Sequence, residues 1–175
     1  MRKLFLALCL LTASLNLNAQ DTQAQENQTN FNEIKLNGLY LVLGAFDVAY
    51  ERTINEESAF GVDLFLPFDD DIDINYYVSP YYRFYFGKKY AAGFFVEGFG
   101  MLNSIDYERF NSSLSSFEEE NVTDFALGIG LGGKWITKSG FIGELNLGIG
   151  RNLFENDDVF DEFVGKLKIS LGYRF

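Results

Sequence analysis

The sequence predicts an all-β fold: an eight-stranded antiparallel up-and-down transmembrane β-barrel with meander topology, preceded by a signal peptide. Three observations support this prediction. Residues 163–175 alternate apolar and polar side chains and end on an aromatic residue, Phe175. Aromatic residues make up 17% of the chain, which also holds 17 glycines, as expected of many strands joined by tight turns. After the N-terminal segment, no apolar stretch is long enough to cross a bilayer as a helix.

The C-terminal segment has two chemically different faces. The two-residue period of a strand puts Lys166, Lys168 and Arg174 on one face and the apolar residues on the other. The apolar face suits lipid and the cationic face suits a wet lumen. A soluble edge strand also alternates, but it would seldom place three cations inward and end on an unprotected phenylalanine. We expect the barrel-assembly machinery to recognise the last apolar residues as a C-terminal signal: Ile169, Leu171, Tyr173 and Phe175.

The N-terminus has the organisation of a signal peptide. Arg2 and Lys3 precede an apolar run over residues 4–17, and Ala19 supplies the small residue that signal peptidase needs. Cleavage is therefore expected near Ala19. The alternative is a lipid anchor at Cys9, which the continuing apolar run disfavours.

The chain then divides into three parts. Residues 1–19 form the signal peptide, residues 20–32 a flexible polar tether, and residues 33–175 a barrel in the outer membrane of a Gram-negative bacterium. The mature chain has neither cysteine nor histidine, so it has no disulfide and no thiol or imidazole chemistry. The net charge of -11 disfavours nucleic acid as a partner, and we expect no cofactor.

Alternating segments bounded by turn residues define the expected strands. With both termini in the periplasm, the inner connections are short. The outer connections are longer and acidic, except for a tight turn near Ala45, and the longest is expected over residues 104–121. This asymmetry is typical of bacterial outer-membrane barrels. The strands are expected at residues 33–44, 46–54, 58–66, 74–86, 91–103, 122–136, 140–151 and 163–175.

Charged residues fall on the inward registers if the more apolar register of each strand faces lipid. Side chains alone fill the interior of a barrel of about eight strands, so acids and bases from different strands must pair across it. We predict an ion-pair network that closes the lumen and leaves no continuous large pore. An acid–base site in a cleft is the alternative for part of this set. The predicted network comprises Lys35, Glu51, Asp63, Arg83, Glu97, Lys134, Glu144, Lys166, Lys168 and Arg174.

Aromatic residues concentrate near the ends of the expected strands, where amphipathic rings match the headgroup zone of a bilayer. The core of a soluble sandwich is the alternative. It explains the contrast between the faces of one strand, but not the terminal phenylalanine, the signal peptide and the loop asymmetry together. We predict an outer girdle of Tyr40, Phe46, Tyr76 and Phe125, and an inner girdle that includes Phe84, Phe86, Trp135 and Phe141.

Two local patterns resemble ligand-binding motifs. Residues 128–133, Gly-Ile-Gly-Leu-Gly-Gly, have the spacing of a dinucleotide fingerprint, but they lie in an alternating strand with no helix after it. We interpret these glycines as inner-wall positions that let lumen side chains pass. The outer connection over residues 66–73 concentrates carboxylates, but Ile74 stands where an EF-hand needs glycine. One interpretation is a solvated acidic loop. The alternative is a loop that loosely binds a divalent cation and, through it, lipopolysaccharide phosphates; the ligands would be Asp69, Asp70, Asp71 and Asp73.

The mature chain resembles the small eight-stranded outer-membrane barrels of the OmpA and OmpX type. It resembles more closely an uncharacterised family of single-barrel proteins with an outer-membrane β-barrel domain. The resemblance implies architecture rather than activity. It implies contact with outer-membrane lipid and lipopolysaccharide, and no cell-wall anchoring, because no periplasmic peptidoglycan-binding domain follows. The motifs that carry it are Lys35-Leu36-Asn37, Tyr50-Glu51-Arg52, residues 80–86, residues 93–98 and residues 171–175.

The function expected from these features is non-enzymatic: a barrel with a largely plugged lumen that contributes to envelope integrity or presents loops for surface contact, with an extracellular ligand that the sequence does not identify. Familiar barrel enzymes use a histidine base, and this chain has no histidine. One alternative is a channel for a small solute or ion, which requires a file of water through the lumen. Another is a soluble lipocalin-like binder in the periplasm, which requires an apolar pocket and a polar exterior.

Overall fold

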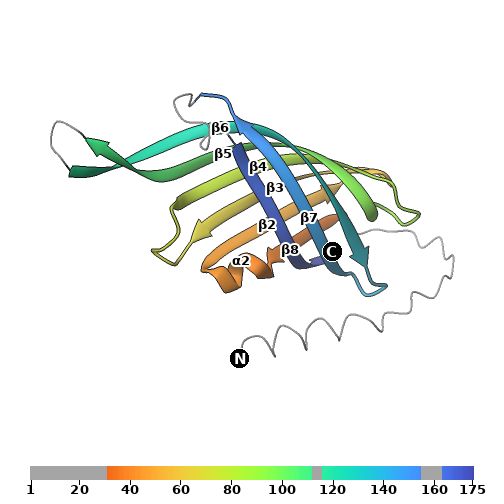
Figure 1. Cartoon of the computed structure of the whole chain (residues 1–175). Coiled ribbons are helices and arrows are strands. Elements are labelled where there is room, and N and C mark those ends of the chain that lie inside the picture. The colour runs from red at the N-terminus through yellow and green to blue at the C-terminus, as the bar shows by residue number, and fades with distance from the viewer. Residues whose placement is uncertain (1–30, 112–115, 155–162) are drawn as a thin grey trace.

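The computed structural model describes residues 31–111, 116–154 and 163–175, and for residues 107–111 and 116–120 it describes the backbone only. The chain forms a closed barrel in which each strand pairs with its neighbours in sequence (Figure 1). The predicted signal peptide and most of the predicted tether lie outside the described residues. The elements are β1 (Asn32–Asn37), α2 (Gly38–Leu43), β2 (Ala45–Thr53), β3 (Ser58–Pro67), β4 (Ile74–Tyr85), β5 (Gly93–Asn111), β6 (Ser116–Ile136), β7 (Phe141–Asn152) and β8 (Phe163–Arg174).

All of the strand pairs are antiparallel, and the pairing of β1 with β8 closes the barrel. The first and last residue pairs between β1 and β8 are Glu33 with Arg174 and Asn37 with Ser170. The predicted eight-stranded up-and-down barrel is therefore confirmed. In the described part of the chain, no helix has both the length and the apolar character needed to cross a membrane.

The first predicted strand, residues 33–44, is wrong in its second half. The chain leaves the sheet after Asn37 and forms α2, so the connection near Ala45 is a short helix rather than a tight turn. The Asn37 side chain accepts a hydrogen bond from the backbone N–H of Leu39 and caps the helix N-terminus. Gly44 ends the helix with φ of 103°, and its N–H donates to the carbonyl of Tyr40.

The third outer connection also differs from the prediction. We expected a loop over residues 104–121, but β5 continues to Asn111 and β6 begins at Ser116, with paired registers up to Asn111 and Ser116. The long hairpin extends beyond the rest of the barrel (Figure 1). Its clustered acids suggested a loop, while its β-branched and aromatic residues favour strands, and pairing between the two segments decided the outcome.

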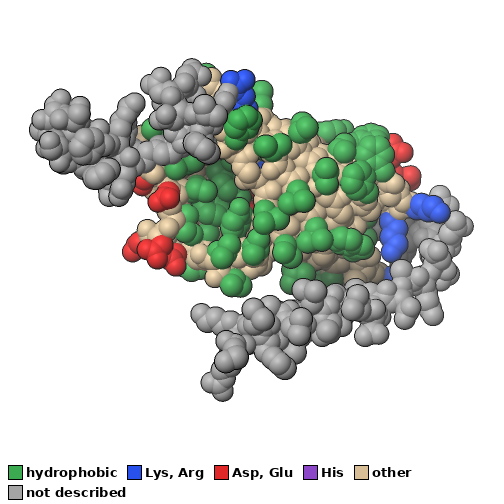
Figure 2. All heavy atoms as spheres, in the orientation of Figure 1, with side chains coloured by type: hydrophobic (Ala, Val, Ile, Leu, Met, Phe, Trp, Pro, Cys, Tyr) green, Lys and Arg blue, Asp and Glu red, His purple; other side chains and the backbone are tan. Residues whose placement is uncertain are grey.

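Burial alternates along the strands with the opposite sense to that of a soluble protein. In β8, for example, Lys166 and Lys168 are buried, whereas Leu167 and Ile169 are about half exposed. Apolar side chains cover much of the visible outer wall, and acidic side chains lie toward both ends of the barrel (Figure 2). Charged side chains of the strands therefore face the interior, and most of the side chains exposed on the outer wall are apolar.

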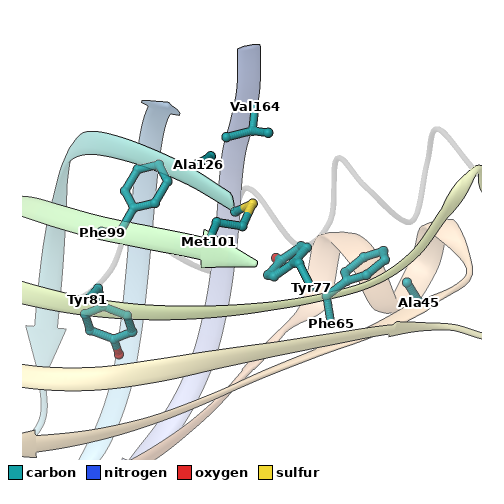
Figure 3. Packing of buried hydrophobic residues seen from close by; sticks show 8 residues of the cluster. All are labelled: Ala45, Phe65, Tyr77, Tyr81, Phe99, Met101, Ala126 and Val164. Atoms are coloured by element: carbon teal, nitrogen blue, oxygen red, sulfur yellow. The ribbon is translucent and has the colours of Figure 1, made fainter. Parts of the chain in front are cut away.

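Two apolar clusters occupy the two ends of the interior. Toward the outer end, Phe65 stacks on Tyr77 with a centroid distance of 4.8 Å, and both belong to the larger cluster shown in Figure 3. At the inner end, Tyr85 and Phe95 pack with Ala59 and with Ala91 from the β4–β5 turn. Charged side chains contact members of both clusters: Arg83 lies over the rings of Tyr81 and Phe95, and Lys166 lies over the ring of Phe99. Burial among these rings strengthens the electrostatic interactions of the charged groups.

Candidate functional site

The candidate site is the charged interior of the barrel. The structure buries all ten side chains of the predicted ion-pair network, each with an exposed fraction of at most 3%. They come from all eight strands because inward positions recur every second residue. The network consists of Lys35, Glu51, Asp63, Arg83, Glu97, Lys134, Glu144, Lys166, Lys168 and Arg174.

Glu51 on β2 is the hub of this network. Its Oε2 accepts hydrogen bonds from Lys35 Nζ at 2.7 Å and Arg83 Nη1 at 2.8 Å, and its Oε1 accepts one from Lys134 Nζ at 2.7 Å. The hydroxyl of Tyr85 also donates to Oε1 at 2.7 Å. Three cations on β1, β4 and β6 therefore converge on one carboxylate, which ties distant parts of the wall together.

Arg83 on β4 makes the second centre of the network. Its Nε donates to Glu97 at 2.6 Å, and its Nη1 donates to Glu144 at 2.8 Å as well as to Glu51. The guanidinium carbon lies 4.3 Å from the ring centroid of Tyr81 and 4.2 Å from that of Phe95. Carboxylates hold the edges of this group and aromatic rings hold its faces, so cation–π contacts add to ion pairing.

The outer half of the network is a chain of two lysines and their acids. Lys166 Nζ lies 2.9 Å from Asp63 Oδ2 and 2.8 Å from Glu97 Oε1. Lys168 Nζ lies 2.6 Å from Asp63 Oδ1 and 3.1 Å from Asp47 Oδ1. Each lysine on β8 therefore bridges two carboxylates from other strands across the interior.

In the inner half of the network, hydrogen bonds connect the C-terminal strand β8 with β1 and with the β4–β5 turn. Glu33 accepts hydrogen bonds from Lys134 at 3.0 Å and from Arg174 Nε at 2.8 Å. Arg174 also donates to the carbonyls of Tyr90 and Ala91 at 3.1 and 3.0 Å. Because Ala91 is fully buried, the β4–β5 turn folds into the inner mouth and Arg174 holds it there.

Sequence reasoning missed several members of the network. Glu33 and Asp47 are fully buried and ion-paired, and they share inward registers with Lys35 and Glu51, so the two-residue period alone would have identified them. The hydroxyl of Tyr81 also donates to Glu51, at 3.1 Å. Tyrosines on inward registers escaped attention because we had expected aromatic rings on the outer surface.

Glycines of β6 make room for inward aromatic rings. A Cβ built on Gly128 would collide with the Phe99 ring, and one built on Gly132 would collide with the Phe95 ring. Both glycines belong to the segment with dinucleotide-like spacing, and the interpretation of these glycines as inner-wall positions over which side chains pass is confirmed.

The charges of the network balance. Six acids and six bases take part, and each acid lies within 4.0 Å of a cation. A carboxylate that already accepts from a buried cation is a poor base, so this arrangement is suited to holding the wall together rather than to moving protons. The acids are Glu33, Asp47, Glu51, Asp63, Glu97 and Glu144, and the bases are Lys35, Arg83, Lys134, Lys166, Lys168 and Arg174.

Most of the predicted girdle residues lie on the outer surface. At the inner end, Phe86 lies between Phe84 and Phe94 with centroid distances of 5.2 and 6.0 Å. Phe46, Trp135 and Phe141 are about half exposed or more, Tyr76 and Phe125 are partly buried on outward registers, and the C-terminal residues Ile169, Leu171, Tyr173 and Phe175 all face outward.

Tyr40 is an exception among the predicted girdle residues. It lies on α2, and its ring packs edge-on against the buried Phe65 with a centroid distance of 5.3 Å. The prediction that Tyr40 faces outward at the end of a strand is wrong, because the helix rotates this side chain toward the interior.

The carboxylates of the acidic outer loop make local contacts in the structure. Asp69 Oδ1 accepts a hydrogen bond from the backbone N–H of Asp71 at 3.1 Å, so this carboxylate stabilises the local turn. In the described ranges, no three acidic, histidine or cysteine side chains come together as a metal ion would require. The acidic residues of the other two outer connections lie among residues whose side chains the structure does not describe.

Two solved structures are similar to this fold. The N-terminal β-barrel domain of OprF from Pseudomonas aeruginosa matches with a TM-score of 0.58 at 16% identity, covering 83% of this chain and 98% of that one. The outer membrane protein Ail from Yersinia pestis matches with a TM-score of 0.41 at 17% identity, covering 83% of this chain and 99% of that one. A search of the curated proteins found no match. The predicted resemblance to small outer-membrane barrels is confirmed at the level of the fold.

A family model matches most of this chain. Residues 5–168 match a sequence family over most of the chain, including β1 to β7 and part of β8. The chain therefore belongs to the family described as "Protein of unknown function (DUF3575)".

Proposed function

We propose that this protein is a non-enzymatic integral barrel of the outer membrane, with a lumen closed by ion pairs, that supports envelope integrity or surface contact. The main support for this proposal is that charged side chains are buried in the interior while apolar side chains are exposed on the outer wall. Fully buried charges line the interior, and exposed apolar residues such as Ile129, Leu147 and Leu171 cover the wall. Exposure of so much apolar surface to water would be strongly unfavourable, whereas lipid tails accommodate it.

Membrane insertion also fits the backbone. A closed barrel pairs its strand edges internally, so it satisfies the backbone hydrogen bonds that lipid cannot. The aromatic rings near the inner end, including Phe86 and Trp135, occupy the position of an interfacial girdle. Outer-membrane lipid and lipopolysaccharide are therefore the proposed surroundings of the wall, and the apolar C-terminal residues are the proposed signal for assembly.

The balanced interior favours a closed barrel over a channel. Ion pairs join strands that are not neighbours, as Lys134 on β6 does with Glu51 on β2 and Arg83 on β4 with Glu144 on β7, and apolar clusters lie toward both ends of the lumen. A soluble lipocalin-like binder would need an apolar pocket and a polar outside, which is the reverse of this arrangement. The acidic outer ends leave surface contact as the proposed route to any partner.

Two measurements test this proposal. Folded protein in outer-membrane fractions should migrate differently before and after boiling, and purified protein in planar bilayers should show no steady conductance. Recovery of the protein in the soluble periplasm would contradict membrane insertion. Stable ohmic currents from the folded protein would instead contradict the closed lumen and favour the channel alternative.

A further inference from the structure

The helix α2 exposes apolar side chains where an extracellular connection would normally be polar. Val42 is 85% exposed and Leu43 is 56% exposed, and Val42 is the most exposed large apolar side chain of the described residues. Neither residue faces the barrel interior. Phe46 on β2 and Phe68 after β3 continue this surface, with a centroid distance of 5.0 Å between their rings.

The registers place α2 in the barrel wall rather than above it. β1 ends at Asn37, opposite Ser170, whereas β8 continues outward as far as Phe163. On the other side, β2 pairs with β3 up to Ala45. Beyond Asn37, no strand of the described part of the chain lies between β8 and β2, and α2 packs against both of them (Figure 1). The helix therefore occupies a gap in the outer half of the sheet.

Asn37 closes the edge of that gap. Its Nδ2 donates to the carbonyl of Leu167 at 3.3 Å, and its Oδ1 accepts from the N–H of Ile169 at 3.2 Å. The side-chain amide thus replaces a backbone peptide and extends the β1–β8 ladder beyond its last residue pair. A side chain that takes the place of a backbone peptide in this way matters most where no water is available to hydrogen-bond the N–H and C=O groups of a strand edge.

The residues beside α2 have the chemistry of the apolar wall. Leu167 and Ile169 on β8 are 46% and 48% exposed, and Phe46 on β2 is 49% exposed. The exposed face of α2 continues this surface without a charged residue between Gly38 and Phe46. A water-exposed loop at this position would have no physical reason to be wholly apolar.

We propose that α2 is a lipid-facing segment of the barrel wall, in contact with the acyl chains of the outer leaflet, rather than an extracellular loop. This inference rests on the proposed membrane location. Continuity with the apolar wall identifies lipid as the occupant. Capping contacts supply partners at both ends of this short helix: the Asn37 side chain accepts from the N–H of Leu39, and the carbonyl of Gly44 accepts from the N–H groups of Phe68 and Asp69. With these contacts the helix can replace strand in the wall, and Tyr40 on its inward side packs against Phe65.

Site-directed spin labelling tests this proposal. The mature sequence has no cysteine, so single replacements Val42→Cys, Ile129→Cys and Lys138→Cys can each be labelled in the full barrel. The proteins are folded into vesicles of phosphatidylethanolamine and phosphatidylglycerol, and heat-dependent migration checks that each is folded. Collision of each label with oxygen, which concentrates in lipid, is compared with collision with a water-soluble nickel chelate. Ile129 is the reference for the apolar wall, and Lys138 is the reference for water.

The proposal predicts that the ratio of oxygen to nickel collision at Val42 lies within about twofold of the Ile129 ratio and well above that at Lys138. Leu43→Cys should give the same result. A water-like ratio at Val42 with a lipid-like ratio at Ile129 would overturn the placement of α2 and leave the membrane barrel intact. A label protected from both reagents would show that protein covers the helix, and it would overturn the proposal too. Water-like ratios at Val42 and Ile129 together would reject the membrane location itself.

Discussion

The two faces of the barrel wall are built by the same strands but follow different rules. On the inner face, each charged side chain depends on particular partners, as Glu51 does on Lys35, Arg83 and Lys134. On the outer face, Ile129 or Leu171 needs only to be apolar. In the proposed membrane location, packing of the outer face against fluid lipid is unspecific, whereas a buried charge is tolerated only when it is paired. The effect of an inward substitution on stability should therefore depend on the charged partners that the side chain loses. The effect of an outward substitution should depend on the polarity of the new side chain and on its depth in the bilayer.

Replacement of the hub should give the largest effect. Glu51→Gln removes the negative charge from a site where three cations converge, and leaves them inadequately compensated. We expect a loss of about 3–5 kcal/mol in the free energy of unfolding, measured by urea titration in lipid vesicles. Arg52→Gln, at the neighbouring exposed position, is the control and should change stability little. Equal losses for the two variants would show that inward and outward charges do not differ as proposed.

A charge placed on the outer face should have the next largest effect. Ile129→Lys puts a cation on the apolar wall, where Ile129 is 71% exposed. The expected loss is about 2–4 kcal/mol if this position lies near the bilayer midplane. The same titration, run with Ser139→Lys in the inner β6–β7 turn, should show almost no change for this control. An unchanged midpoint for Ile129→Lys would argue that water rather than lipid surrounds the wall.

Glycines on the two faces should respond differently to an added methyl group. Gly132→Ala would press against the Phe95 ring and the Leu145 carbonyl, whereas a Cβ at Gly98 meets nothing within 4 Å. We expect Gly132→Ala to cost about 1–3 kcal/mol from overpacking and Gly98→Ala to be neutral or slightly stabilising. Combining Gly132→Ala with Phe95→Leu should recover part of the loss, and a failure to recover would indicate backbone strain as the cause.

The acidic outer loop should give the smallest effect. Asp70 and Asp71 are exposed, so replacing both with asparagine should change stability by less than about 0.5 kcal/mol. The midpoint of unfolding should also be insensitive to a chelator. A drop on chelation in the wild-type protein that the double variant abolishes would instead assign a divalent cation to this loop.

The sequence alone did not predict the structure of two regions, the long β5–β6 hairpin and the connection between β1 and β2. Residues 38–43 are almost wholly apolar, and such a short run has no periodicity that separates helix from strand. The capping contacts of Asn37 and Gly44 decided in favour of helix. In β5 and β6, strand formers and clustered acids gave opposing signals, and the pairing of residues far apart in the sequence determined the outcome.

The sequence by itself determined the fold class and the side of the wall on which the ten predicted network residues lie. Alternation has a period of two, so one correct register assigns a whole strand. Only the tertiary structure decided which charges meet, because partners such as Lys35 and Glu144 are brought together by closure of the barrel and not by any local pattern. It also decided that Tyr40 turns inward and that α2 fills the gap between β8 and β2, since both depend on where neighbouring strands end.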